Sequence, residues 1–238
     1  MGTSLAVAVA QPVCVPGDVV ANAKAHAGVI RRAGAQLVVF PELSLTGYEP
    51  GAPAVDPEDE VLRPIVDACA ATGSMALVGA PVCRGAAKYM ATLAVTGAGA
   101  EVAYCKMCLG DAEMDLFSAG PGPAAMTIAG WRVGLGICKD TRIIEHIEST
   151  LALSLDLYVA GLVHHPHELA DQDGRAARIT GRGRIPVAFA SAAGRAGRAY
   201  PETAGHSCVW AGDGTVLARA SAEAGDIAVA VLGRERAS

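Results

Sequence analysis

Short apolar runs alternate with longer amphipathic stretches along the whole chain. Leu5–Ala10 and Leu37–Phe40 are runs of the first kind, which is typical of buried strands. Between them, Asp18 is placed to cap a helix that extends to about Ala33. The apolar positions that share one face of this helix are Val20, Ala23, Ala27 and Ile30. The N-terminal part of the chain therefore predicts a strand, a helix and a second strand.

The same alternation continues to the C-terminus. Further helices are predicted at Glu58–Thr72, Ile143–Leu155 and Asp171–Arg182. Further strands are predicted at Ala76–Gly79, Ala91–Val95, Glu101–Cys105, Trp131–Ile137, Leu157–Leu162, Val187–Ala192 and Ile227–Val231. A loop rich in Gly and Pro is expected before the turn at Gly130. A hairpin is expected at Ser207–Ala211 and Thr215–Ala220, around the turn Gly212-Asp213-Gly214.

Helix and strand patterns are spread evenly from end to end, without a linker, a low-complexity tract or a short-period repeat. The length of 238 residues suits one large domain, and we expect a single domain over residues 1–238. The mixture of strand–helix–strand units and hairpins predicts an α/β fold with a mixed sheet, or two sheets, covered by helices.

Composition narrows the classes of partner. The net charge of −5 argues against nucleic acid, which needs a basic face, and against electrostatic binding to anionic membranes. No apolar run approaches the roughly 20 residues of a membrane span. The first residues do not resemble a signal peptide, so we expect a cytoplasmic protein. The seven cysteines are odd in number and scattered, which disfavours a disulfide framework.

Three predicted strands each end on a reactive side chain. Leu37–Phe40 leads into Pro41 and Glu42, Glu101–Cys105 leads into Lys106, and Trp131–Ile137 leads into Cys138. Ligands of α/β folds bind at such strand ends. An ammonium can stabilise a thiolate and a carboxylate can take the thiol proton, so the three groups would suit nucleophilic attack on an amide-like carbon. Periodicity alone cannot bring them together in space.

Three motifs around these residues resemble those of the nitrilase superfamily of carbon–nitrogen hydrolases. VVFPELSLTGYEP is similar to its glutamate motif, AYCKMCL to its lysine motif and VGLGICKDTR to its cysteine motif, in the family's order and at family-like gaps. IPVAFASAAGR and GHSCVWAGDGTVLA resemble its penultimate strand and closing hairpin. The resemblance implies a catalytic triad of Glu42 as base, Lys106 as cation and Cys138 as nucleophile.

The resemblance also carries expectations about the rest of the protein. It implies a four-layer α-β-β-α sandwich with two mixed sheets, no metal or other cofactor, and a homodimer or higher homo-oligomer. It implies a small-molecule amide substrate, an N-carbamoyl compound being the related case. Nitrile hydrolysis on the same triad remains an alternative, as does a non-catalytic ligand-binding or assembly module that keeps the fold.

Further positions are candidates for substrate binding. The family carries a second glutamate after the lysine, and Glu113 stands where that pattern asks, four residues before Phe117. The backbone N–H of Lys139 would help Lys106 to stabilise an oxyanion. Lys139 itself stands where relatives often have an aromatic residue. His165 follows a strand end, so we expect it to contact substrate.

Two other patterns allow different chemistry. Cys105 and Cys108 form a C-x-x-C, which could be a redox pair or half of a zinc site, although no second C-x-x-C exists. His164, His165 and His167 could bind metal, but Pro166 disturbs the strand geometry that would align them. The catalytic triad is the better explanation of the chain's chemistry.

Overall fold

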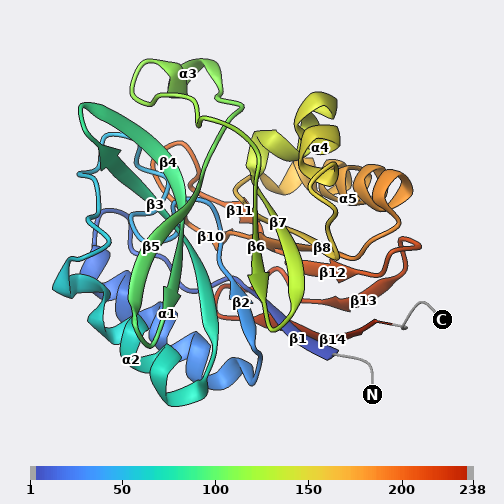
Figure 1. Ribbon diagram of the computed structural model, residues 1–238. Coiled ribbons are helices and arrows are strands. Elements are labelled where there is room, and N and C mark those ends of the chain that lie inside the picture. The colour runs from blue at the N-terminus through green and yellow to red at the C-terminus, as the bar shows by residue number, and fades with distance from the viewer. Residues whose placement is uncertain (1–3, 235–238) are drawn as a thin grey trace.

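Two six-stranded sheets make up most of the computed structural model, which describes residues 4–234 (Figure 1). The first sheet has the strand order β14-β1-β2-β3-β4-β5. Its strands are β1 (Ser4–Ala10), β2 (Leu37–Val39), β3 (Met75–Arg84), β4 (Ala87–Thr96), β5 (Gly99–Cys105) and β14 (Ile227–Gly233).

The second sheet has the strand order β13-β12-β9-β8-β7-β6. Its strands are β6 (Ala124–Ile128), β7 (Trp131–Ile137), β8 (Leu157–Leu162), β9 (Val187–Ser191), β12 (Cys208–Trp210) and β13 (Val216–Arg219). In each sheet, two parallel pairings at the centre are flanked by antiparallel ones, so both sheets are mixed. A separate two-stranded ladder joins β10 (Ala193–Gly194) to β11 (Thr203–Ala204).

Helices cover the outer face of each sheet. The helices α1 (Val19–Ala33) and α2 (Arg63–Thr72) share an apolar core with the first sheet. The helices α4 (Ile144–Leu151) and α5 (Leu169–Gly183) share another with the second sheet. A third core lies between the two sheets. The fold is therefore the four-layer α-β-β-α sandwich with two mixed sheets that the family resemblance implied, and that prediction is confirmed.

Alternation along β1 shows how the sequence builds these layers. A strand presents successive side chains to opposite faces. Leu5, Val7 and Val9 enter the core between the sheets. Ala6, Ala8 and Ala10 lie on the face toward the helices. The apolar run is therefore continuous because both faces are buried, and its short alanines leave room for a helix to approach.

Several predicted elements have different limits in the structure. The loop expected before Gly130 contains strand β6, which is formed by antiparallel pairing with β7 over Ala124–Ile128. The helix expected at Ile143–Leu155 ends at Leu151, and Ser154 adopts a left-handed conformation with φ of 60°. The helix expected from Glu58 begins as a 3-10 turn, Glu60–Leu62, before α2. Pairing and packing set these limits, and neither is visible in local periodicity.

Three short helices complete the chain. They are α3 (Asp111–Met114), which lies in the loop at the top of Figure 1, and two 3-10 helices, η2 (Cys138–Arg142) and η3 (Pro166–Glu168). Asp18 caps α1 as predicted, accepting a hydrogen bond from the backbone N–H of Ala21 at 2.9 Å. The short helices α3 and η2 carry three of the candidate site residues, which are Glu113, Cys138 and Lys139.

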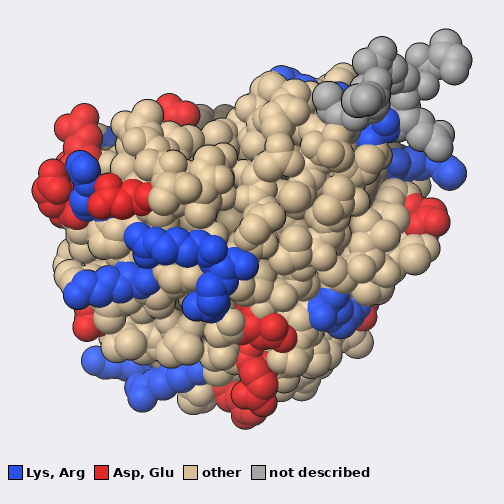
Figure 2. Space-filling model, turned by 90° about the horizontal axis from the view of Figure 1, so that it is seen from below, with Lys and Arg blue, Asp and Glu red and all other residues tan. Residues whose placement is uncertain are grey.

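The distribution of surface charge and the lengths of the helices are relevant to binding of nucleic acid and to membrane spans. Seen from below, Lys and Arg side chains lie in separate groups, with wide uncharged areas between them, rather than in one continuous basic surface (Figure 2). None of the helices within residues 4–234 has both the length and the apolar character needed to cross a bilayer.

Candidate active site

The three predicted strand ends meet at one cavity. Glu42 follows β2 and Lys106 follows β5; these two strands run in the same direction, so their ends lie at one edge of the first sheet. Cys138 follows β7 of the second sheet. All three side chains line a cavity of about 220 Å³. The structure therefore brings together residues that the sequence could place only on separate strands.

The ammonium of Lys106 lies between two carboxylates. Its Nζ donates to Glu42 Oε1 at 2.6 Å and to Glu113 Oε1 at 2.8 Å, and the Lys106 side chain is only 1% exposed. Burial disfavours the charged form, but Glu42, together with Glu113 and the Cys138 sulfur, raises the pKa of Lys106 above its usual value. Lys106 therefore stays charged at neutral pH and supplies a fixed positive charge to the cavity.

Glu113 is held in place by donors as well as by Lys106. It lies in α3, accepting a hydrogen bond from Tyr48 Oη at 2.6 Å on Oε1 and from the backbone N–H of Gly110 at 2.7 Å on Oε2. Burial alone would raise the pKa of Glu113, but Lys106 and these donors lower it below its usual value. Glu113 is therefore ionised, and its contacts hold the Lys106 ammonium in place.

Glu42 differs from Glu113 in its environment. Its Oε1 accepts from Lys106, whereas its buried Oε2 has no hydrogen-bond partner among residues 4–234. Burial raises the pKa of Glu42 to about 7, with Lys106 opposing the shift and the charge of Glu113 adding to it. A carboxylate whose pKa lies near neutrality, with one oxygen available, is suited to accept and return a proton.

Cys138 opens η2 directly after β7. Its backbone has φ of 39°, a left-handed conformation that is uncommon for a residue with a side chain and that recurs at functional sites. Its Sγ lies 3.4 Å from the carbonyl oxygen of Val163. Burial raises the pKa of Cys138 to about 11; Glu42 adds to the shift, while Lys106 and Arg175 oppose it. The surroundings of the sulfur therefore favour the neutral thiol over the thiolate.

A buried network beneath η2 fixes the turn that carries Cys138. Asp140 Oδ2 accepts from the backbone N–H of Ile137 at 2.9 Å and from Tyr104 Oη at 2.8 Å. Its other oxygen accepts from the backbone N–H of Cys108 at 2.8 Å. Tyr104 in turn contacts His146 Nε2 at 2.8 Å. Tyr104 and Cys108 lie on either side of Lys106 in the chain. The Asp140 carboxylate therefore links the turn that carries Cys138 to the segment that carries Lys106.

The other predicted contact residues occupy different places. Lys139 lines the cavity, and its Nζ donates to the carbonyl oxygen of Leu109 at 2.7 Å. His164, rather than His165, lines the cavity. The ring of His165 instead stacks on that of Tyr200, at 4.6 Å between centroids, and Tyr200 is a cavity residue. Contact of His165 with substrate stays a prediction.

The sequence did not point to several cavity residues, among them Tyr48, Arg175 and Tyr200. Tyr48 lies within the FPELSLTGYEP stretch, so the motif itself could have pointed to it. Arg175 lies in α5 and Tyr200 in the segment before β11, in a region rich in Arg and Ala. No local pattern separates these two residues from their neighbours, because only the packing of α5 and of this segment brings them to the cavity.

The cysteine pair and the histidine run show no metal site in the described chain. Cys105 and Cys108 are both free thiols; Cys105 lies in the core between the first sheet and its helices. Within residues 4–234 no group of three or more His, Cys, Asp or Glu side chains is arranged to hold a metal ion.

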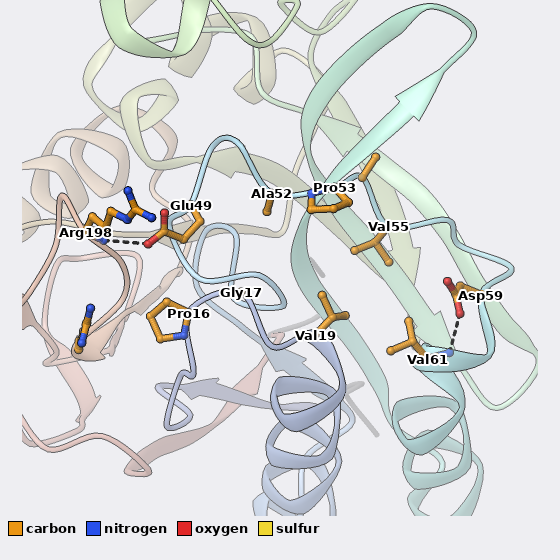
Figure 3. A pocket seen from close by; sticks show the side chains of 12 residues that line it. Pro16, Gly17, Val19, Glu49, Ala52, Pro53, Val55, Asp59, Val61 and Arg198 are labelled. Carbon is orange, nitrogen blue, oxygen red and sulfur yellow. Dashed lines mark hydrogen bonds between the residues drawn. The ribbon is translucent and has the colours of Figure 1, made fainter.

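A larger hollow of about 630 Å³ lies elsewhere on the surface (Figure 3). Valines and prolines line much of it, and the backbone N–H of Arg198 donates to Glu49 Oε1 at 3.0 Å at one end. It contains no cysteine, histidine or lysine side chain. The smaller cavity around Cys138 is therefore the candidate active site.

The sequence model of the carbon-nitrogen hydrolase family matches residues 6–238. This chain belongs to the carbon–nitrogen hydrolase family, within the nitrilase superfamily. The chain is also 30% identical, over 207 residues, to a glutamine-dependent NAD(+) synthetase from Xanthomonas campestris pv. campestris. That match covers 79% of this chain but only 36% of the relative, so the chain spans about a third of that protein.

Solved structures share the fold of this carbon–nitrogen hydrolase. Nit3 of Saccharomyces cerevisiae, a member of branch 10 of the nitrilase superfamily, superposes with a TM-score of 0.85 at 19% identity, covering 97% of this chain and 90% of Nit3. A double mutant of the amidase from Nesterenkonia sp. AN1, in complex with acrylamide, gives a TM-score of 0.81 at 21% identity, covering 97% of this chain and 91% of the amidase. At these identities the likeness establishes the fold.

Proposed function

We propose that this carbon–nitrogen hydrolase cleaves a non-peptide C–N bond of a small amide through a thioester on Cys138, with release of ammonia. The observation that carries the proposal is the buried contact of Lys106 with Glu42 and Glu113 in the cavity that also holds Cys138. Cys138 supplies a nucleophile, Glu42 a proton acceptor and Lys106 a fixed cation, and acyl transfer through a thiol requires these three groups.

The first half of the reaction transfers the acyl group. As Cys138 Sγ attacks the amide carbon, its proton passes to Glu42, and the carbonyl oxygen takes up negative charge beside Lys106. When this tetrahedral intermediate collapses, the C–N bond breaks and the nitrogen leaves with the proton from Glu42. Because burial raises the pKa of Cys138, we propose that the thiol loses its proton during the attack rather than before it.

The second half regenerates the enzyme. Glu42 takes a proton from water, which attacks the thioester, and the acid product leaves as Cys138 recovers a proton. Fixing Glu42 by one oxygen only, through Lys106, leaves Oε2 available in both halves. The same carboxylate therefore serves as base and then acid in each half-reaction.

The cavity limits the substrate to a small molecule, and the similar proteins favour an amide. A cavity of about 220 Å³ suits a small molecule. Among the similar proteins, one is an amidase that binds acrylamide, and another depends on glutamine, whose side chain is a primary amide. An N-carbamoyl compound would use the same steps and is the related candidate.

A substrate panel tests the proposal. We expect wild-type protein to release ammonia from at least one small primary amide among acetamide, propionamide, acrylamide and glutamine, and Cys138→Ala to release none. Matched nitriles and N-carbamoyl amino acids in the same assay separate the alternatives. Equal rates for wild type and Cys138→Ala across the panel would show that the chain is a non-catalytic module.

Intact-mass spectrometry identifies the intermediate. Rapid quenching of a turnover mixture should show a fraction of the protein heavier by the mass of the acyl group, and peptide mapping should place it on Cys138. The adduct mass then names the acyl part of the substrate.

We also propose that the protein forms a homodimer or higher homo-oligomer. Strand β14 lies at the edge of the first sheet and exposes Val229 and Val231, the latter by 70%. Exposed apolar side chains on an edge strand are features that favour association. Light scattering coupled to size exclusion gives the mass in solution, and a monomer at micromolar concentration would contradict this proposal.

A further inference from the structure

The position of Arg175 is not explained by the Glu42, Lys106 and Cys138 chemistry. Arg175 lies in α5, outside the three motifs, and yet it lines the cavity with Cys138. Its residue is only 1% exposed. A guanidinium is always charged in proteins, so its burial requires compensating contacts.

Asp171 supplies only part of that compensation. Arg175 Nε and Nη2 both donate to Asp171 Oδ2, at 2.8 and 2.6 Å, and Arg142 Nη2 approaches the same oxygen at 2.7 Å. Asp171 therefore fixes the plane of the Arg175 guanidinium. The third nitrogen, Nη1, is buried and has no hydrogen-bond partner among residues 4–234. A held guanidinium with one unused donor in a reaction cavity is arranged to receive an acceptor that arrives with the reaction.

The charges around Cys138 indicate which acceptor this is. Glu42, Lys106, Arg175 and Tyr200 face Cys138 from four different parts of the chain. Arg175 lowers the pKa of Cys138, against the larger effect of burial. Conversely, although burial disfavours the charge of Arg175, its pKa is raised, chiefly by Cys138 and then by Asp171. Arg175 and Cys138 line the same cavity, so a negative charge that forms on the sulfur is the acceptor that suits the unpaired Nη1.

We propose that Arg175 is a further catalytic residue, whose Nη1 donates a hydrogen bond to the negative charge that forms on Cys138 Sγ and on the substrate oxygen during attack. The inference rests on the proposed function. Arg175 keeps its proton throughout: the thiol proton passes to Glu42, the S–C bond forms, and the carbonyl electron pair moves onto oxygen between Lys106 and Arg175. The site thus has two cations around the nucleophile, one from each sheet-and-helix half.

Alkylation of Cys138 tests the proposal without any substrate. Iodoacetamide, a neutral probe, reports the thiolate through its rate, read at Cys138 by peptide mass spectrometry because the chain has seven cysteines. We expect Arg175→Gln to move the pH profile upward by about one unit, which is a roughly tenfold slower reaction at fixed pH below the pKa. Arg175→Lys should react at a rate between those of wild type and Arg175→Gln, because it keeps the charge but cannot reproduce the Nη1 contact. Arg182→Gln, on the exposed side of the same helix, is the matched control and should react as wild type.

A second probe distinguishes catalysis from substrate anchoring. If Arg175 instead anchored a substrate carboxylate, Arg175→Gln would slow iodoacetate but leave iodoacetamide within about twofold of wild type, and the proposal would be wrong. On the amide found in the panel, we expect kcat to fall about 100-fold with KM little changed. Loss confined to KM would also overturn it. Circular dichroism and thermal unfolding check that the variants fold. If Arg175→Gln does not fold, Arg175→Lys is compared with Arg182→Lys, and we expect a clear fall in the iodoacetamide rate because the lysine ammonium cannot reproduce the Nη1 contact. An unchanged rate would contradict the proposal.

The outcomes for Arg175 and for the amidase proposal are separable. Iodoacetamide reacts with Cys138 whether or not any amide is hydrolysed. If Arg175→Gln slows the alkylation of Cys138 as expected but no amide yields ammonia, only the proposed substrate class is rejected, and the proposal for Arg175 stands.

Discussion

Gly79 and Gly161 lie on different sheets and contact the same short stretch of backbone, from Phe40 to Leu43. A Cβ on Gly161 of β8 would be 2.6 Å from the carbonyl oxygen of Phe40 and 2.8 Å from the amide nitrogen of Glu42. A Cβ on Gly79 of β3 would collide with the carbonyl oxygen of Pro41 and the amide nitrogen of Leu43. The backbone that carries the candidate base is thus held between the two sheets, at positions where only glycine fits.

Substitution of Gly161 by alanine should therefore displace Glu42. Overpacking at such a contact costs about 1–3 kcal/mol of stability, and a shift of the base by about 1 Å lowers the rate by up to about 100-fold. We expect Gly161→Ala to lower both Tm and kcat. Gly174→Ala is the control, because a Cβ there meets nothing within 4 Å and alanine favours the helix α5 by about 0.5–1 kcal/mol. Equal activity of the two variants would contradict the close-contact interpretation.

The pH dependence of hydrolysis should report Glu42. The reaction needs the carboxylate form, so kcat/KM should rise as the pH rises through about 7, the raised pKa of Glu42, and then level off. Lys106 adds no descending limb near neutrality because its pKa is raised. Measuring kcat/KM between about pH 5.5 and 8.5 checks this, and Glu42→Gln should remove the activity at every pH. A flat wild-type profile would assign the proton transfer to another group.

The hydroxyl of Tyr48 should contribute to catalysis through Glu113. Tyr48→Phe removes the 2.6 Å hydrogen bond to Glu113 Oε1 but keeps the ring, which packs edge-on against Tyr200. A hydrogen bond to a charged group contributes about 1.5–3 kcal/mol, so we expect kcat/KM to fall at least about tenfold. Tyr89→Phe, on β4 and outside the cavity, should be neutral in the same assay. Steady-state kinetics that do not distinguish the two variants would count against a role for Glu113 in fixing Lys106.

Asp140 should contribute more to the stability of the fold than an exposed aspartate does. Asp140→Asn replaces an acceptor of three hydrogen bonds, two of them fully buried, by a group that turns an amide N–H toward at least one of the donors. We expect a loss of about 2–3 kcal/mol and a Tm lower by roughly 5–10 °C. Asp115→Asn, at an exposed position, is the control for the same chemical change. Thermal melts that coincide would show that the network beneath Cys138 contributes little.

Local pattern was sufficient for the main elements and not for their edges. Asp18 as cap and the apolar positions Ala23, Ala27 and Ile30 predicted α1 correctly, because capping and burial of one face are properties of consecutive residues. Val20, predicted on the same face, is instead 55% exposed in the first turn of the helix. Strand β6 was missed because its pairing with β7 across the turn at Gly130 defines it, and a Gly- and Pro-rich segment precedes it. The same limit applies to the histidine run, in which the turn into η3 decides that His164 lines the cavity.

The sequence by itself determined the chemistry that is available. Apolar runs that lead into Glu42, Lys106 and Cys138 place these side chains at strand ends, and the three motifs resemble one family in their order and spacing. Only the tertiary structure decided how the groups meet. The strand order of the first sheet brings Lys106 Nζ within 2.6 Å of Glu42 Oε1. The stacking of the two sheets places Gly79 and Gly161 against the backbone of the base, and the packing of α5 places Arg175 in the cavity with Cys138. The reason is physical: strands buried on both faces look alike in sequence, so sheet order and the contacts of distant segments follow from packing the whole chain.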